Sequence, residues 1–216
     1  MKRWEALDPG TLTVTRRERR GQGASTIVPR SPKGSPRMPP PPDLQDAVLA
    51  AWRTNSRVTT YFIAHIPAAL WSATVPGVPS RTIRAIGAHL HNARCRWIKT
   101  LGHEHGIVAP TRVDQRAVTR RQLLSALVRS SRGIAALLQL GCTRGGRIPP
   151  SKAYTWRNLA LDVGHVLTYF VAHDAHHRGQ IVMVARQLNC RLSTAATAGL
   201  WQWRPRQREV GGSARR

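Results

Sequence analysis

The stretch between Leu159 and Leu188 constrains the fold of this chain most, because it lacks proline and repeats apolar residues with a helical period. His173 and His177 in this stretch are one helical turn apart, so both imidazoles can point at the same spot. A helix uses this spacing to offer two nitrogens to one divalent metal. His176 is offset by about 60° around the helix, so we expect it to flank such a site. The alternative is a buried helix whose histidines only find hydrogen-bond partners.

Length and charge limit the classes of protein to consider. At 216 residues with 41% hydrophobic residues, the chain can form one full domain with its own core. The net charge of +24 comes mostly from arginine and is spread along the chain without a run of five basic residues. We therefore expect weak, non-specific binding of polyanions rather than a dedicated DNA-binding surface.

The cysteines and the apolar runs indicate a cellular compartment. Cys95, Cys142 and Cys190 are isolated and form no CxxC pair, which is typical of a reducing compartment without a disulfide framework. The N-terminal sequence has no apolar signal-like region, and no run of 18 apolar residues occurs. We expect a cytoplasmic protein that does not span a membrane.

The chain divides into three parts by composition. Residues 1–42 are basic and rich in Pro and Arg, which predicts disorder; a translation start at Met38 would remove most of this segment. Residues 43–203 carry the helical patterns. Residues 204–216 read as a basic flexible tail, and just before them Leu200, Trp201 and Trp203 are expected to pack back onto the domain.

Four amphipathic segments without an alternating strand pattern predict an all-α four-helix bundle. The first helix follows Asp43, has Asn55 within its apolar stripe and ends near Pro67. The second spans 81–101, the third starts with the capping-box pattern at Thr119 and is stopped by Gly141, and the fourth is 159–188.

The second predicted helix supplies a candidate third ligand. His89 lies in its apolar stripe and could meet His173 and His177 across the bundle interior. His91 is about 160° away around the helix and is expected to face solvent. His103 and His105 follow in a glycine-flanked loop, where we expect exposed side chains.

With these residues placed, the chain resembles the DinB-like (DinB/YfiT-type) family of helical-bundle metalloproteins. The resemblance rests on AHLHNARCRWI (88–98), YFVAHDAHHRGQIVMVARQL (169–188) and GLWQW (199–203), and it covers residues 43–203. It implies a four-helix bundle of the up-down-down-up type, with one divalent metal bound by His89, His173 and His177. Some relatives resemble transferases that use the metal to activate a low-molecular-weight thiol, and many have no assigned reaction.

Three protein nitrogens leave a metal with an open position for water, thiol or substrate, which is typical of catalytic sites. Zinc, nickel and iron all accept imidazole. We expect Tyr169, Arg178 and Gln180 to hold a small-molecule substrate or to orient the ligands, with a solvated charge as the alternative for Arg178. The resulting hypothesis is a metal-dependent hydrolase or a thiol-dependent transferase.

Three other interpretations stay open. His173-Asp174-x-x-His177 has the form of a zincin helix with Asp in place of Glu, but no downstream ligand stands at the usual spacing. A second interpretation is a non-enzymatic, DNA-damage-associated or nucleic-acid-binding bundle, although no known nucleic-acid-binding motif occurs. The third is a structural bundle whose histidines bind no metal. An exposed apolar face could also support a homodimer.

Overall fold

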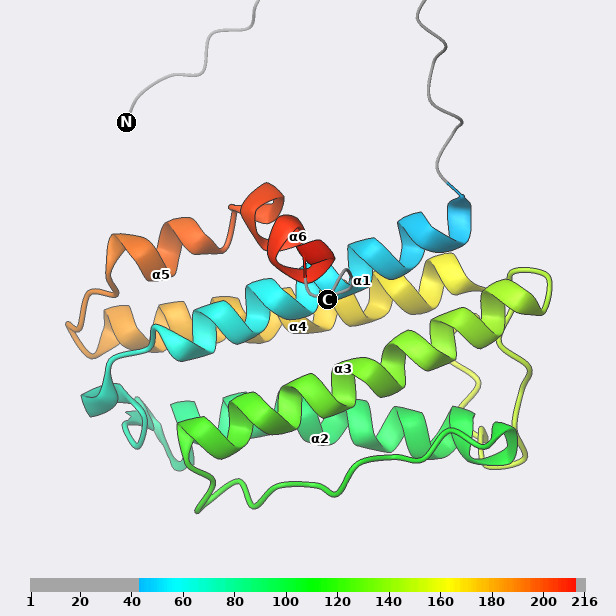
Figure 1. The fold of residues 1–216 in the computed structure, drawn as a ribbon. Helices are drawn as coiled ribbons and strands as arrows, with labels where there is room; N and C mark the ends of the chain where they lie inside the picture. Colours follow the sequence, from blue (N-terminus) through cyan, green and yellow to red (C-terminus); the bar gives the residue numbers. More distant parts are fainter. Residues whose placement is uncertain (1–42, 213–216) are drawn as a thin grey trace, which may run out of the picture. The chain divides into compact units, whose positions relative to one another are not determined.

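The computed structural model describes residues 43–212, which form a bundle of long helices followed by two short ones (Figure 1). The long helices are α1 (Leu44–Ala64), α2 (Ile83–Gly102), α3 (Arg120–Thr143) and α4 (Val163–Gln187). The short helices are α5 (Thr194–Gly199) and α6 (Trp203–Gly212). The all-α fold predicted from the sequence is confirmed.

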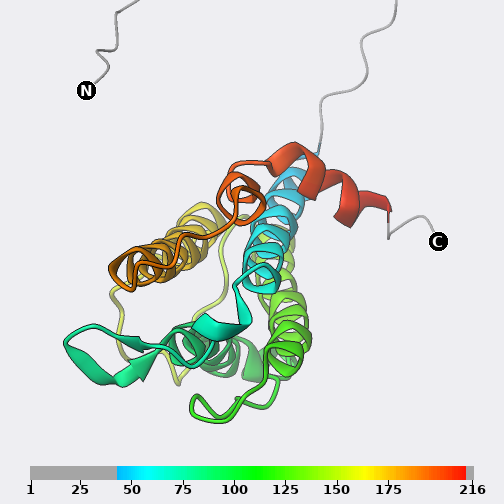
Figure 2. The same cartoon turned by 90° about the vertical axis from the view of Figure 1, so that its left-hand side faces the viewer.

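The long helices have the up-down-down-up topology. In Figure 1, α1 and α4 run in one direction, whereas α2 and α3 run in the other. Around the bundle, α3 lies between α1 and α2, and α4 closes the ring by packing on both of them (Figure 2). Because α2 and α3 are parallel, the segment that joins them has to return along the length of the bundle (Figure 1).

The connections contain little regular structure. A 3-10 turn, η1 (Ala68–Leu70), follows α1, and an antiparallel hairpin of β1 (Thr74–Val75) and β2 (Val78–Thr82) leads into α2. Gly77 turns this hairpin with a φ of 75°, a left-handed value that suits glycine. A second turn, η2 (His103–His105), ends α2.

Side-chain caps set where the helices begin. The Thr119 hydroxyl accepts from the backbone N–H of Gln122, whose side chain in turn accepts from the N–H of Thr119, so the predicted capping box is present. Asp162 caps α4 by accepting from the N–H of His165. For this reason α4 starts at Val163, a few residues later than the apolar pattern suggested.

The core consists of two apolar clusters with a polar layer between them. One cluster surrounds Phe62 and Leu90, and the other surrounds Trp52 and Phe170. The buried side chains between these clusters come from α1, α2 and α4, and we call them the polar layer: Asn55, Thr59, Arg94, Asp174 and Arg178. This layer lies at the level of the histidine pair of α4, because Asp174 directly follows His173.

The prediction of a flexible tail at 204–216 is wrong for most of this segment, because α6 occupies Trp203–Gly212. Arg206 is buried with its guanidinium 3.9 Å from the centre of the Tyr61 ring, and it pairs with Glu209 at 2.7 Å. These contacts hold α6 against α1. Trp201 was expected to pack on the bundle but is 84% exposed, whereas Leu200 does pack against the core.

Two glycines play different roles from those expected. Gly141 lies inside α3 rather than at its end, and a Cβ there would come within 2.5 Å of a Val163 methyl carbon. It therefore allows the start of α4 to approach α3 closely. Gly179 was expected to permit such an approach, but outside the neighbouring backbone of α4 no described atom lies within 4 Å of a Cβ placed there.

Among the described residues, α3 is the one helix long and apolar enough to cross a membrane by length and composition. Its apolar side chains, which include Leu123, Leu127 and Leu137, are buried in the two core clusters. Such a helix is typical of the core of a water-soluble bundle.

Candidate metal centre

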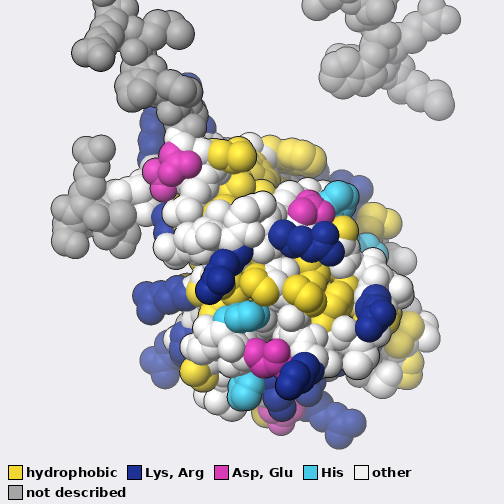
Figure 3. Space-filling model, turned by 90° about the vertical axis from the view of Figure 1, so that its right-hand side faces the viewer, with side chains coloured by type: hydrophobic (Ala, Val, Ile, Leu, Met, Phe, Trp, Pro, Cys, Tyr) yellow, Lys and Arg dark blue, Asp and Glu magenta, His cyan; other side chains and the backbone are white. Residues whose placement is uncertain are grey.

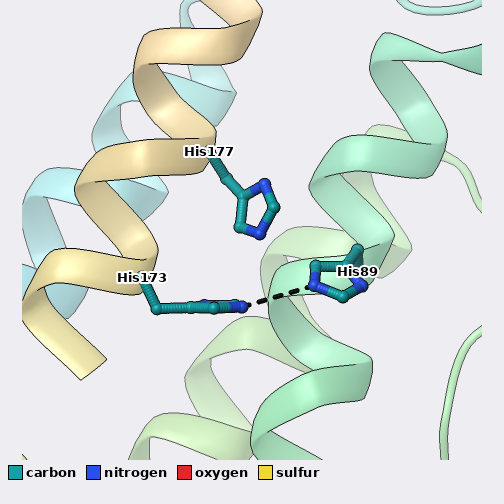
Figure 4. A group of neighbouring side chains, drawn as sticks. All are labelled: His89, His173 and His177. Carbon is teal, nitrogen blue, oxygen red and sulfur yellow. Dashed lines mark hydrogen bonds between the residues drawn. The ribbon is translucent and has the colours of Figure 1, made fainter. Parts of the chain in front are cut away.

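The structure brings His89 of α2 together with His173 and His177 of α4 (Figure 4). The Nε2 atoms of His89 and His173 are 3.3 Å apart. The ring centres of His89 and His177 are 4.6 Å apart, and those of His173 and His177 are 4.5 Å apart. The loop histidines His103 and His105 lie in η2, about four helical turns further along the chain from His89.

The arrangement fits a divalent metal. One nitrogen from each of the three rings can be chosen so that all three lie within 4.8 Å of one another. Tetrahedral zinc with Zn–N bonds of about 2.0–2.1 Å separates two ligand nitrogens by about 3.3 Å. The nitrogens therefore need only small side-chain movements to surround one ion. A set of three neutral nitrogens also leaves a coordination position open for a small ligand.

Gln180 sets the orientation of His177. The Nδ1 atom of His177 lies 2.8 Å from Gln180 Oε1, so Nδ1–H donates and Nε2 keeps its lone pair for a metal. Arg81, from β2, donates to the same Oε1 at 3.1 Å. His176 flanks the site, and its Nε2 accepts from the Gln180 amide at 2.9 Å.

His173 is held by packing on one side, while its Nε2 faces the Nε2 of His89. The Tyr169 ring stacks on the His173 ring at 6.0 Å with an interplanar angle of 24°. The Nδ1 of His173 is buried and has no hydrogen-bond partner among the described residues. Tyr169 thus stacks on the histidine that it was expected to accompany.

Burial keeps all three histidines neutral. It is the largest cause lowering the pKa of each ring, and in His173 the pKa falls to about 4. The neighbouring His177 lowers the pKa of His89 and His173 further. Neutral imidazole is the form that binds metals, so the electrostatic environment suits the same chemistry as the geometry.

Asp174 points away from the histidines into the polar layer. Its Oδ2 accepts from Arg94 at 2.5 Å, from Asn55 at 2.9 Å and from Thr59 at 3.0 Å. The carboxylate is fully buried and ion-paired with Arg94. It therefore cannot act as the general base of a zincin-like site, and its role is to anchor α4 to α1 and α2.

Arg178 also belongs to the polar layer. Its guanidinium donates to Asn55 Oδ1 at 3.1 Å and to the Thr59 hydroxyl at 2.6 Å. The side chain is buried, and this burial lowers its pKa. The alternative of a solvated helix charge does not apply, and these bonds direct the side chain toward α1 rather than toward the histidines.

His91 was expected to face solvent, but it is fully buried. Its Nε2 lies 2.9 Å from the carbonyl of Thr111 and 3.3 Å from the Cys95 sulfur. The returning segment between α2 and α3 covers this side of α2, and Asn92 holds it by exchanging two hydrogen bonds with Val113. A helical projection of α2 alone could not reveal this cover.

Two further residues near the centre, Arg94 and Arg81, were not predicted from the sequence. Arg94 stands in α2 about one turn from His91, is fully buried and lies with its guanidinium over the Trp52 ring. The sequence feature that could have predicted a buried Arg94 is a polar residue on the inward side of each of three helices, namely Asn55, Arg94 and Asp174. Polar groups on facing stripes satisfy one another when the helices pack.

One comparison with known proteins bears on this architecture. A search of curated proteins finds no match. The sequence profile of the DinB family matches residues 42–191, well over half of the chain, and this range contains the three histidines and all four long helices. The chain belongs to the DinB family.

Proposed function

We propose that this protein is a metal-dependent enzyme that binds one divalent ion through His89, His173 and His177. The observation that carries the proposal is the convergence of three neutral, partly buried imidazoles on one point, with the Nε2 atoms of His89 and His173 only 3.3 Å apart. An ion held there would act as a Lewis acid that lowers the pKa of water or a thiol in its open position.

The chain itself would position the reactants. Gln180 keeps the Nε2 of His177 available, and Tyr169 restricts the ring of His173. Arg81 brings a positive charge beside Gln180. A nucleophile that becomes negatively charged at this place is stabilised by that charge. These features support hydrolysis or transfer with a small-molecule substrate, and a low-molecular-weight thiol is the co-substrate that we propose.

Elemental analysis tests this proposal. Untagged protein purified without chelators should contain about one equivalent of zinc, nickel or iron, because the centre can hold a single ion. A variant with His173→Ala and His177→Ala should contain none. His103→Ala is a matched control, since it removes an exposed histidine outside the centre and should retain the metal. An empty wild-type protein would refute the metalloenzyme proposal.

A nucleic-acid-associated bundle is the second candidate, because of the net charge of +24. On the face in Figure 3, Lys and Arg side chains are scattered among carboxylates and uncharged groups rather than gathered in one stripe. Electrostatic binding of a nucleic acid should weaken steeply with increasing salt concentration and should persist in a variant that lacks His173. Cytoplasmic location and a homodimer stay predictions.

A further inference from the structure

An aromatic pocket lies beside the histidine centre, on the side where Tyr169 stands. It has a volume of about 380 Å³ and is formed by α2, the loop before α4 and the first half of α4. Its principal side chains are Arg96, Trp97, Tyr154, Trp156 and Tyr169. This volume is within the range of small-molecule sites.

The rings in this pocket are arranged around Trp97. The centre of its ring lies 6.1 Å from Tyr154, 5.7 Å from Trp156 and 5.4 Å from Tyr169. The indole N–H of Trp97 donates to the Tyr169 hydroxyl at 3.3 Å. Four aromatic side chains therefore present faces and edges to one small space, which is a surface suited to a flat apolar group.

Hydrogen bonds within the loop before α4 fix the wall that this loop contributes to the pocket. The Tyr154 hydroxyl donates to the carbonyl of Leu159 at 2.7 Å and accepts from its N–H at 2.8 Å. With the Asn158 amide oriented to satisfy both of its groups, its oxygen accepts from the Trp156 indole at 2.9 Å. Arg157 between them adopts a left-handed φ of 52°, which is costly for a residue other than glycine.

These contacts hold Trp156 with 56% of its surface exposed. A large indole gains free energy from burial, so a loop that fixes it in an exposed position next to three other rings leaves a surface for a ligand to cover.

The charge of the pocket selects among flat ligands. Arg96 is exposed at its edge, and no carboxylate is among the described residues that line it. An aromatic cage for an organic cation would lack such an arginine. A guanidinium binds carboxylates through two parallel hydrogen bonds, so the pocket favours an anion.

We propose that this pocket binds aromatic carboxylates, with the ring of the ligand against Trp97 and Trp156 and its carboxylate on Arg96. Tyr169 is shared by the pocket and the stack on His173, so a bound acid lies beside His173. The role of this acid as the substrate rests on the proposed function. Its binding to the pocket does not require a metal.

Calorimetric titration of the full chain tests the proposal with 3-phenylpropionate as the probe, both with and without chelator. The acid should bind in both conditions, and 3-phenylpropionamide should bind about tenfold more weakly, because a charge-assisted pair with arginine is lost. Equal binding of acid and amide, or tighter binding of a phenethyltrimethylammonium cation, would overturn the assignment.

Two pairs of variants locate the site. Trp156→Ala should weaken binding of the acid about tenfold, as expected when a stacking wall is removed, while Trp201→Ala, which removes an 84% exposed indole outside the pocket, should not. Arg96→Gln should reduce the affinity for the acid to that for the amide, whereas Arg132→Gln on α3 should leave it unchanged. Equal effects within either pair would refute the location.

The two proposals fail separately. If the metal analysis is negative but the acid binds with this variant pattern, the pocket stands and the metalloenzyme proposal falls. If one equivalent of metal is present but the acid does not bind, the pocket assignment is wrong.

Discussion

At the scale of single residues, the buried charges of the polar layer are the ones whose loss would destabilise this fold most. Asp174 is the carboxylate that compensates two buried guanidinium groups, Arg94 and Arg178, and one of its oxygens has no partner among the described residues. Removal of one member of a buried ion pair leaves an uncompensated charge. Stability therefore depends on Asp174 more than on any exposed acid.

We expect Asp174→Ala to lower the free energy of unfolding by about 3–5 kcal/mol, measured by urea denaturation. Asp46→Ala is the control, because Asp46 is exposed in the first turn of α1 and should change stability by less than about 1 kcal/mol. A loss at Asp174 no larger than that at Asp46 would show that the polar layer is not required for stability.

Cys95 gives a second prediction at this scale. Burial raises the pKa of its thiol to about 11, so at pH 8 only about one molecule in a thousand carries the thiolate that reacts with disulfide reagents. Native protein should be labelled at Cys142 and Cys190 but not at Cys95, and unfolding in urea should expose it. Labelling followed by peptide mass spectrometry checks this, and rapid native labelling of Cys95 would contradict the burial.

At the scale of elements, α6 shows how a segment of low hydrophobicity can be ordered by a few contacts. Its helix is fixed by one arginine that lies on Tyr61 of α1 and pairs with Glu209, while Arg57 of α1 pairs with the same carboxylate. The apolar pattern that identifies core helices is absent here, which explains why the segment resembled a flexible tail.

Arg206→Ala should therefore release α6 while the bundle stays folded. Amide hydrogen exchange in residues 203–212 should become faster, and exchange in α1 to α4 should change little, because local opening of a peripheral element costs less than global unfolding. Arg208→Ala, an exposed arginine on the same helix, should leave the exchange pattern unchanged. Equal exchange in the two variants would show that α6 is held by other contacts.

At the scale of the whole molecule, an ion bound by the three histidines should add stability without being needed for the fold. The two apolar clusters span the bundle on either side of the polar layer, so the helices have a complete core of their own. A ligand that binds only the folded state stabilises it by about 2.7 kcal/mol when present at 100 times its Kd. Chains of this size gain roughly 2–4 °C in Tm per kcal/mol.

We expect chelation to lower the Tm by several degrees while the far-ultraviolet circular dichroism at 25 °C stays the same. The variant with His173→Ala and His177→Ala should show no response to chelator. An unchanged Tm in the wild-type protein would favour a structural bundle whose histidines bind no metal, and loss of helix on chelation would show that the ion is part of the fold.

The local sequence was sufficient to predict the four long helices and the pairing of the histidines on α4. Helical period, capping residues such as Asp43 and Thr119, and the His173–His177 spacing depend on neighbours within one or two turns. The position of His89 in its stripe and the family resemblance then predicted the third member of the group, and the structure brings all three together.

Only the tertiary structure decided what covers or meets each helix face. His91 is buried because a segment twenty residues later in the chain returns across it. Asp174 points into the bundle because Arg94 of α2 and Asn55 of α1 donate hydrogen bonds to its carboxylate. The aromatic pocket likewise joins rings from α2, α4 and the loop between α3 and α4. Helical periodicity reports which residues share a face, but the partner of that face depends on contacts between distant parts of the chain.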